Sequence, residues 1–215
     1  MKILVVGNDK IGGMAAAQFV GRDDIVCVVD KSSSLARVFM LVRKGRLSLS
    51  LIGKMFVAEL LRPGSLPPAS CYSVVSNRDL AEVIADVSPS EVILFRAGLI
   101  VGQAVLDLGV RIVNLHCCRL PDYGGIGTIS KALRARAFDQ EATLHVVTTR
   151  IDEGEVLSVS PYRLSPDLSY AANEEVAYCA GLRLLSEYLD RSRSVSHINQ
   201  RPDQLQPPPD LLRTQ

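Results

Sequence analysis

Asn114 and His116 are two residues whose types and spacing could carry out a reaction. They interrupt an apolar run over residues 112–115 that is typical of a buried strand. Because they are two positions apart, their side chains project from the same face of that strand. An amide and an imidazole in such a place are either satisfied inside the core or face a cleft where chemistry occurs. A polar loop rich in glycine and proline follows at residues 117–125.

Other reactive residue types surround this pair. Asp152 lies in an Asp-Glu-Gly turn, where an aspartate taken alone usually caps backbone N–H groups. Cys117 and Cys118 directly follow His116, but adjacent ligands suit tetrahedral zinc poorly, and the sequence has no C-x-x-C pair. A cysteine nucleophile would need an orienting partner that the sequence does not single out. We therefore predict no metal site and interpret the cysteines as packing residues.

A glycine-containing turn after the first predicted strand could bind phosphate. Residues 7–13 read Gly-Asn-Asp-Lys-Ile-Gly-Gly, and Asp30 lies where a dinucleotide-binding fold places its ribose-binding acid. Asp9 replaces the middle glycine of G-x-G-x-x-G, and its carboxylate would repel a pyrophosphate. The P-loop pattern fails because Gly13 and Met14 stand where Lys and Ser or Thr are required. We favour a tight strand-to-helix turn, with a weak anion site at its backbone N–H groups and an NAD(P)-binding oxidoreductase as alternatives.

The order of the predicted elements supplies a scaffold for these residues. Strands and helices alternate up to the strand that contains Asn114, which predicts a Rossmann-like, doubly wound α/β sheet. We expect about seven strands, mostly parallel, with a C-terminal antiparallel hairpin and a long C-terminal helix. The other predicted strands are residues 2–6, 25–29, 71–75, 91–95, 142–148 and 155–163, and the predicted helices outside residues 32–61 are 11–20, 77–85, 101–108, 126–137 and 168–189.

The sequence predicts one catalytic domain over residues 1–190, followed by a polar, proline-rich tail at 191–215. Residues 32–61 form a helical insertion of two helices joined near Gly45. Its basic residues favour a solvated face over a buried apolar stripe, with a patch for an anionic substrate or membrane surface as the alternative.

Composition limits the class of protein. The net charge of +1 and the absence of Trp argue against nucleic acid or an anionic membrane as partner. No stretch is long enough to span a membrane, and the first apolar run is too short for a signal peptide. An odd number of cysteines, five, predicts reduced thiols and a cytoplasmic location.

Several stretches of the chain together resemble one family. They read Ile-Val-Asn-Leu-His at 112–116, Leu-Pro-Asp-Tyr-Gly-Gly at 120–125, Ala-Leu at 132–133, Thr-Leu-His-Val-Val at 143–147 and Ile-Asp-Glu-Gly-Glu-Val at 151–156. The chain thus resembles the folate-dependent formyltransferases over roughly residues 1–165. The resemblance implies an enzyme that transfers a formyl group from its co-substrate 10-formyltetrahydrofolate to a small amine, without a metal.

The resemblance also implies roles for individual residues. Asn114 would donate a hydrogen bond to the tetrahedral oxyanion. His116 would stabilise that charge or move protons between the amine and the folate nitrogen. Asp152 would orient His116 or an ordered water. The implied folate-binding residues are Ala97, Gly98, Leu99, Ile100, Thr148, Arg150, Ile151 and Asp152, and the predicted acceptor-binding residues are Gly7, Asn8, Asp9, Lys10, Cys118, Tyr123 and Gly125.

Departures from the family pattern narrow the acceptor by elimination. After His116 the loop reads Cys-Cys-Arg instead of Pro-Ser-Leu or a near variant, and Gly124 replaces a basic residue. The purine-pathway enzyme, which formylates glycinamide ribonucleotide, has a phosphate loop after its first strand and an Asn-Ala-His that this chain lacks. The methionyl-tRNA enzyme has a second, basic domain, for which residues 191–215 are too short.

What remains is the amino group of a nucleotide-linked sugar, or another small amine of secondary metabolism. A glycinamide ribonucleotide formyltransferase and a non-catalytic folate-binding relative stay as alternatives. The helical insertion could shape the acceptor pocket or a homodimer surface.

Overall fold

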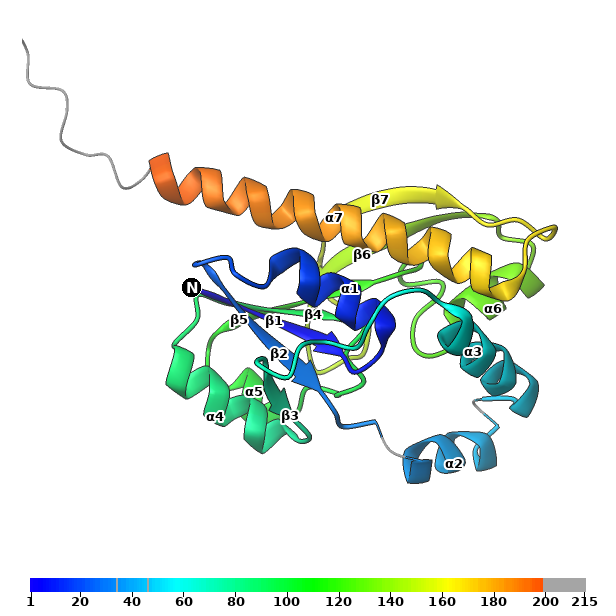
Figure 1. The fold of residues 1–215 in the computed structure, drawn as a ribbon, viewed down its shortest axis with the longest axis horizontal. Helices are drawn as coiled ribbons and strands as arrows, with labels where there is room; N and C mark the ends of the chain where they lie inside the picture. The colour runs from blue at the N-terminus through cyan, green and yellow to red at the C-terminus, as the bar shows by residue number, and fades with distance from the viewer. Residues whose placement is uncertain (34, 46, 199–215) are drawn as a thin grey trace, which may run out of the picture.

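A seven-stranded sheet forms the centre of the protein (Figure 1). The computed structural model describes residues 1–33, 35–45 and 47–198. The strand order is β3-β2-β1-β4-β5-β6-β7. The first five strands pair in parallel, whereas β5 with β6 and β6 with β7 pair antiparallel, which confirms the predicted fold class. The strands are β1 (Lys2–Gly7), β2 (Ile25–Asp30), β3 (Tyr72–Val74), β4 (Glu91–Phe95), β5 (Arg111–His116), β6 (Asp139–Val146) and β7 (Val156–Arg163).

Helices cover both faces of the sheet (Figure 1), so its central strands carry apolar side chains on both faces. In β1, Leu4 and Val6 pack into the core on the side of α1 and α7, while Ile3 and Val5 pack into the core on the side of α4 and α5. This alternation follows from the period of two residues in a strand. The helices are α1 (Lys10–Phe19), α2 (Leu35–Arg43), α3 (Leu49–Leu61), α4 (Asn77–Val87), α5 (Gln103–Leu106), α6 (Thr128–Arg134) and α7 (Tyr170–Ile198).

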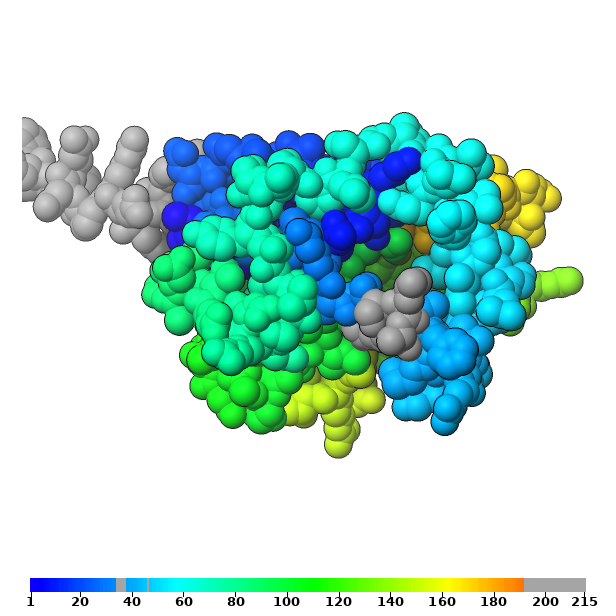
Figure 2. All heavy atoms as spheres, turned by 60° about the horizontal axis from the view of Figure 1, so that its bottom comes forward, coloured from blue at the N-terminus to red at the C-terminus, as the bar shows by residue number. Residues whose placement is uncertain are grey.

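The insertion contains the two helices that the sequence predicts. Ser48 caps α3 by accepting a hydrogen bond from the Leu51 backbone N–H (3.1 Å), and α3 packs against α7. A Cβ on Gly127 would lie 2.8 Å from the Leu51 side chain, so α3 also approaches the start of α6 closely. In Figure 2, α2 and α3 flank a hollow in the molecular surface.

The C-terminal helix is longer than predicted. α7 ends at Ile198, so residues 191–198 are helical where the sequence predicts the start of a tail. Buried alanines and leucines on α7 hold it against the sheet. The remaining tail residues, 199–215, lie outside the described residues. Within the described part of the chain, no helix combines the length and apolar character needed to cross a membrane.

Candidate active site

Asn114 meets a second buried polar residue across the sheet. It lies on β5 directly opposite His145 of β6. The Nδ2 of Asn114 is 3.1 Å from Nε2 of His145, and Nδ1 of His145 is 3.0 Å from the Val146 carbonyl oxygen. A carbonyl only accepts, so Nδ1 carries the proton and Nε2 accepts from the Asn114 amide. His145 therefore fixes the direction of the Asn114 NH₂ group and leaves it a second N–H.

His145 is held in the neutral form. The residue is 2% exposed, and this burial lowers its pKa below the ordinary value of 6.5. The hydrogen bond to Val146 and the nearby Asp152 carboxylate act in the opposite direction, but burial is the larger effect. A neutral ring keeps the acceptor lone pair that Asn114 needs.

His116, at the end of β5, is fixed by the loop that follows it. Its Nε2 donates a hydrogen bond to the Tyr123 carbonyl oxygen at 2.8 Å. Its Nδ1 lies 3.8 Å from Oδ2 of Asp152. In the neutral ring the nitrogen that faces Asp152 therefore carries the lone pair, which could accept a proton.

Asp152 approaches both histidines from the loop between β6 and β7. Its Oδ1 lies 3.6 Å from Nε2 of His145, and its Oδ2 accepts a hydrogen bond from the Gly125 backbone N–H at 2.7 Å. Its side chain is only 11% exposed. The backbone of Asp152 is left-handed (φ 59°). A Cβ on Gly124 would lie 3.3 Å from the Asp152 Cβ, so glycine there gives the carboxylate room.

The three predicted catalytic residues thus lie in one cluster, with His145 as a fourth member. The cluster combines an oriented amide donor, an imidazole with a free lone pair and a carboxylate. Such a set can stabilise an oxyanion and move a proton at neighbouring positions.

A cavity of about 210 Å³ opens beside Asn114 and His116. Arg96 lines it, and its guanidinium donates hydrogen bonds to Asp9 and to the Tyr178 hydroxyl. Burial opposes the charge of Arg96, but Tyr178, Asp9 and Glu174 outweigh that effect and raise its pKa. The cavity is lined by Met55, Arg96, Ala97, Asn114, Leu115, His116, Cys117, Gly125, Ile126, Gly127, Thr128, Ile129, Tyr170, Glu174 and Tyr178.

The residues predicted to bind folate lie in two loops at this edge of the sheet. Ala97 and Leu99 follow β4, and they pack against the same buried cluster as Val147, at the end of β6. Ile100 and Ile151 leave 54% and 59% of their surface exposed. Gly98 has no room for a side chain, because a Cβ there would lie 2.5 Å from the Ser33 hydroxyl. In the other loop, the Thr148 hydroxyl donates to the Arg150 carbonyl at 3.1 Å, and the Arg150 side chain is exposed.

Four of the predicted acceptor-binding residues, Gly7 to Lys10, lie in the turn after β1, and Asp9 and Lys10 already have hydrogen-bond partners within the protein. Asp9 caps α1 by accepting from the Gly12 backbone N–H (2.8 Å). The Lys10 backbone N–H donates to Glu59 (2.7 Å), and its ammonium donates to the carbonyl oxygens of Leu60 and Arg62. Two carboxylates therefore already bind N–H groups at the start of α1, which agrees with the favoured tight turn and argues against the alternative of a weak anion site there.

The other predicted acceptor residues differ in position. Gly125 lines the cavity, and Tyr123 supplies the carbonyl that holds His116. Cys118 is fully buried, with its sulfur 3.5 Å from the Tyr162 hydroxyl, so its side chain points into the core. Gly7 packs closely against the Arg96 backbone. For Asn8, no polar contact within the described residues connects it to the cluster.

Asp30 does not face a ligand site. It is 2% exposed, and its carboxylate accepts hydrogen bonds from the backbone N–H groups of Ser32 and Leu99, both at 2.7 Å. This carboxylate connects β2 to the loop after β4, which argues against a ribose-binding role and hence against the NAD(P) alternative. Within the described ranges, no group of three His, Cys, Asp or Glu side chains could hold a metal ion.

Sequence reasoning missed His145, Arg96 and Glu174. His145 lies within β6 at a buried position. The available sequence signal was a polar residue at a position that the strand buries. Arg96 directly follows the apolar strand β4 and also adopts a left-handed backbone (φ 59°). No sequence signal distinguishes Glu174 from the exposed acids of α7.

Residues 55–177, more than half of the chain, match the formyl transferase family. A methionyl-tRNA formyltransferase of Chromobacterium violaceum is 26% identical over 116 residues, which are 54% of this chain and 38% of that protein. The enzyme of that name from Paramagnetospirillum magneticum is 30% identical over 132 residues, 60% of this chain and 40% of its own length. The chain therefore spans well under half the length of these curated relatives.

Solved structures share the fold at low sequence identity. A phosphoribosylglycinamide formyltransferase of Anaplasma phagocytophilum has a TM-score of 0.58 at 14% identity, over 84% of this chain and 80% of that one. A sugar N-formyltransferase of a Shewanella species has a TM-score of 0.58 at 17% identity, over 88% and 68%. The match over residues 55–177 includes the Asn114, His116, His145 and Asp152 cluster, and this chain belongs to the formyl transferase family.

Proposed function

We propose that this protein is an N-formyltransferase that moves the formyl group of 10-formyltetrahydrofolate to the primary amine of a small acceptor, the amino group of a nucleotide-linked sugar. The observation that carries the proposal is the cluster of Asn114, His116 and Asp152, of which Asn114 and His116 line the 210 Å³ cavity, in a member of the formyl transferase family. Sugar N-formyltransferases among the structural neighbours support the acceptor class.

The residues of the cluster fit the bonds that change. The amine nitrogen attacks the formyl carbon, and the carbonyl oxygen becomes an oxyanion, to which the second N–H of Asn114 donates. Nδ1 of His116 accepts the proton that the amine loses, and Asp152 stabilises the resulting imidazolium at 3.8 Å. The C–N bond to the folate then breaks, and the leaving folate nitrogen takes a proton from His116. No step needs a metal or an oxidant.

Features of the two edge loops suit a folate. Each loop presents an exposed isoleucine, Ile100 or Ile151, that could cover the flat face of a pterin ring. The backbone groups of residues 148–151 lie at the surface beside Asp152 and could bind the polar edge of that ring. The 210 Å³ cavity is small for a folate but has room for the reacting part of an amine acceptor.

The start of α1 argues against glycinamide ribonucleotide as acceptor. A ribose phosphate there would meet the carboxylates of Asp9 and Glu59, which already bind the backbone N–H groups of Gly12 and Lys10. Arg96 and Arg62 pair with these carboxylates, but the backbone N–H groups that a phosphate would need are already bound. The glycinamide alternative therefore has less support than an amino-sugar nucleotide.

A direct test is formylation of a panel of amines with 10-formyltetrahydrofolate, followed by mass spectrometry. The panel contains amino-sugar nucleotides, glycinamide ribonucleotide and simple amino sugars. We expect transfer to an amino-sugar nucleotide, and we expect Asn114→Ala, His116→Ala and Asp152→Ala to lose it while circular dichroism shows folded protein. Full activity in any variant would exclude the role given to that residue. A folded protein that binds folate but formylates no amine would favour the non-catalytic relative.

A further inference from the structure

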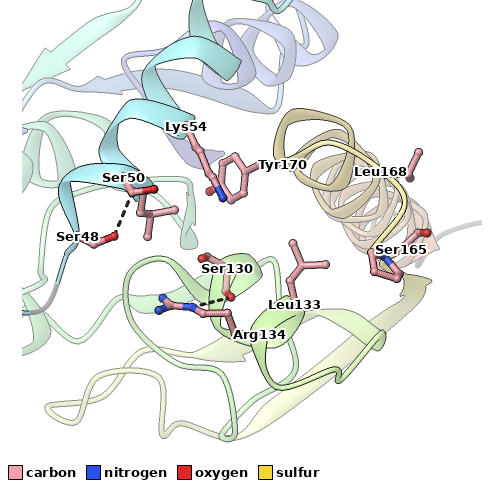
Figure 3. Close-up of a pocket in the computed structure, with 11 residues that line it drawn as sticks. Ser48, Ser50, Lys54, Ser130, Leu133, Arg134, Ser165, Leu168 and Tyr170 are labelled. Carbon is pink, nitrogen blue, oxygen red and sulfur yellow. Dashed lines mark hydrogen bonds between the residues drawn. The ribbon is translucent and has the colours of Figure 1, made fainter.

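A second, larger cavity lies next to the proposed active site. It has a volume of about 510 Å³ and lies between α3, α6 and the start of α7 (Figure 3). None of its lining residues was singled out in the sequence as a ligand-binding residue, although four of them lie in the helical insertion at 32–61 that could shape the acceptor pocket. They are Ser48, Ser50, Leu51, Lys54, Ser130, Leu133, Arg134, Ser165, Pro166, Leu168 and Tyr170. We call this cavity the α3–α6 pocket.

The charged side chains that line the α3–α6 pocket are all positive. Lys54 and Arg134 bring two cations to it from opposite walls, and no Asp or Glu lines it. Within the described part of the chain, Lys54 makes no hydrogen bond or ion pair, and Arg134 uses only its Nε, which donates to the Ser130 carbonyl at 3.4 Å. The terminal nitrogens of Arg134 and the ammonium of Lys54 are therefore available to an anion. Four serines add hydroxyl groups that can donate hydrogen bonds.

The two cavities share a wall. Tyr170 lines both of them, and α3 supplies Met55 to the first cavity and Lys54 to the second. Tyr170 is held in place, because its hydroxyl donates to Glu174 (3.2 Å), which is in turn bound by Arg62 (2.7 Å). A ligand that reaches past Tyr170 could thus place an amine beside His116 and an anionic group between α3 and α6.

We propose that the α3–α6 pocket binds a phosphate or diphosphate group of the acceptor. Arg134 can form a two-point contact with phosphate oxygens, and Lys54 can add a charge-assisted hydrogen bond. This inference rests on the proposed function for the identity of the ligand as acceptor, and it assigns acceptor recognition to the inserted helix α3. It also moves the expected phosphate contact away from the first turn, where Asp9 and Glu59 stand.

The experiment is calorimetric titration of the whole protein with UDP, dTDP, inorganic pyrophosphate and uridine. We expect the diphosphates and pyrophosphate to bind and uridine to bind far more weakly. Lys54→Gln and Arg134→Gln should each raise the Kd for UDP by roughly 10- to 100-fold, the effect of losing one hydrogen bond to a charged group. Arg78→Gln is the matched control, because Arg78 is an exposed cation on the distant helix α4. The Kd of the Arg78→Gln variant for UDP should equal that of the unaltered protein.

Methyl NMR locates the ligand independently of activity. UDP should shift the methyl signals of Leu51 and Leu133, which line the pocket, and leave that of Val105 on the opposite face of the sheet unchanged. Equal UDP affinity in both charge variants, or no binding of any diphosphate, would overturn the α3–α6 pocket as an anion site. If the variants lose UDP while no amine is formylated, the pocket stands and the proposed function falls. If an amine is formylated and both variants bind UDP normally, the proposed function stands and the α3–α6 pocket is not an anion site.

Discussion

His145 is predicted to act on catalysis only through Asn114. The change His145→Leu removes the acceptor that lies 3.1 Å from the Asn114 amide nitrogen in a region that is almost fully buried. One net hydrogen bond of this kind contributes about 1 kcal/mol. If that energy holds the Asn114 amide toward the oxyanion, kcat should fall about 5-fold, because a 10-fold change corresponds to about 1.4 kcal/mol.

The expected loss of kcat is larger for Asn114→Ala than for His145→Leu. Removal of an oxyanion donor usually lowers kcat by roughly 10²- to 10³-fold, so Asn114→Ala sets the upper limit for any residue that acts through it. In the Asn114→Ala background, His145→Leu should therefore lower kcat by less than about 2-fold further, because the group it positions is gone.

The assay is steady-state formyl transfer to the best acceptor of the panel, with both substrates saturating. Ser160→Ala serves as the control, because Ser160 is a buried hydroxyl of β7 that accepts hydrogen bonds from Arg183 and does not contact Asn114. It should lower thermal stability and leave kcat unchanged. Equal fold-losses from His145→Leu with and without Asn114 would refute the positioning role, and so would an unchanged kcat in the single variant.

Three further predictions concern the elements around the site. Gly154→Ala would place a Cβ 1.7 Å from the Val146 carbonyl oxygen, so the turn must shift and Asp152 must move with it. We expect the free energy of unfolding, measured by thermal denaturation, to fall by about 1–3 kcal/mol and kcat to fall roughly 10²-fold. Arg62→Met leaves the buried Glu174 carboxylate without its ion-pair partner and should cost about 3–5 kcal/mol in urea unfolding, whereas the double variant with Glu174→Gln should recover most of that loss. Because burial lowers the pKa of His145 in the folded state, the unfolded chain binds more protons just below pH 6.5, so the free energy of unfolding should fall as the pH drops from about 6.5 through the folded pKa. The His145→Leu variant should show a smaller loss over that range, and an identical pH dependence in both proteins would contradict the assignment.

Much of the fold could be predicted because its cause is local. An apolar strand such as β1 must be buried on both faces, and the alternation with helices leaves few arrangements for a mostly parallel sheet. The grouping of Asn114 with His116 follows from the period of a single strand. The end of α7 was predicted too early because residues 191–198 are polar, and polarity alone does not end a helix that already packs against the sheet along its earlier turns.

The unpredicted parts of the site depend on which distant residues meet, and this is where acceptor choice would be decided. His145 acquires its role only when β6 pairs with β5 in the register that places it opposite Asn114. Lys54 and Arg134 are 80 positions apart in sequence, and each alone is an ordinary surface cation of a helix. They form an anion pocket only because α3 folds back over α6, where Leu51 contacts the position of Gly127. The spacing of the glycine turn after β1 is visible in the sequence, yet N–H groups at its helix start are already bound by Asp9 and Glu59. A member of this family that binds its acceptor through α3 would lose phosphate recognition on changes in the insertion while its formyl-transfer cluster stays intact.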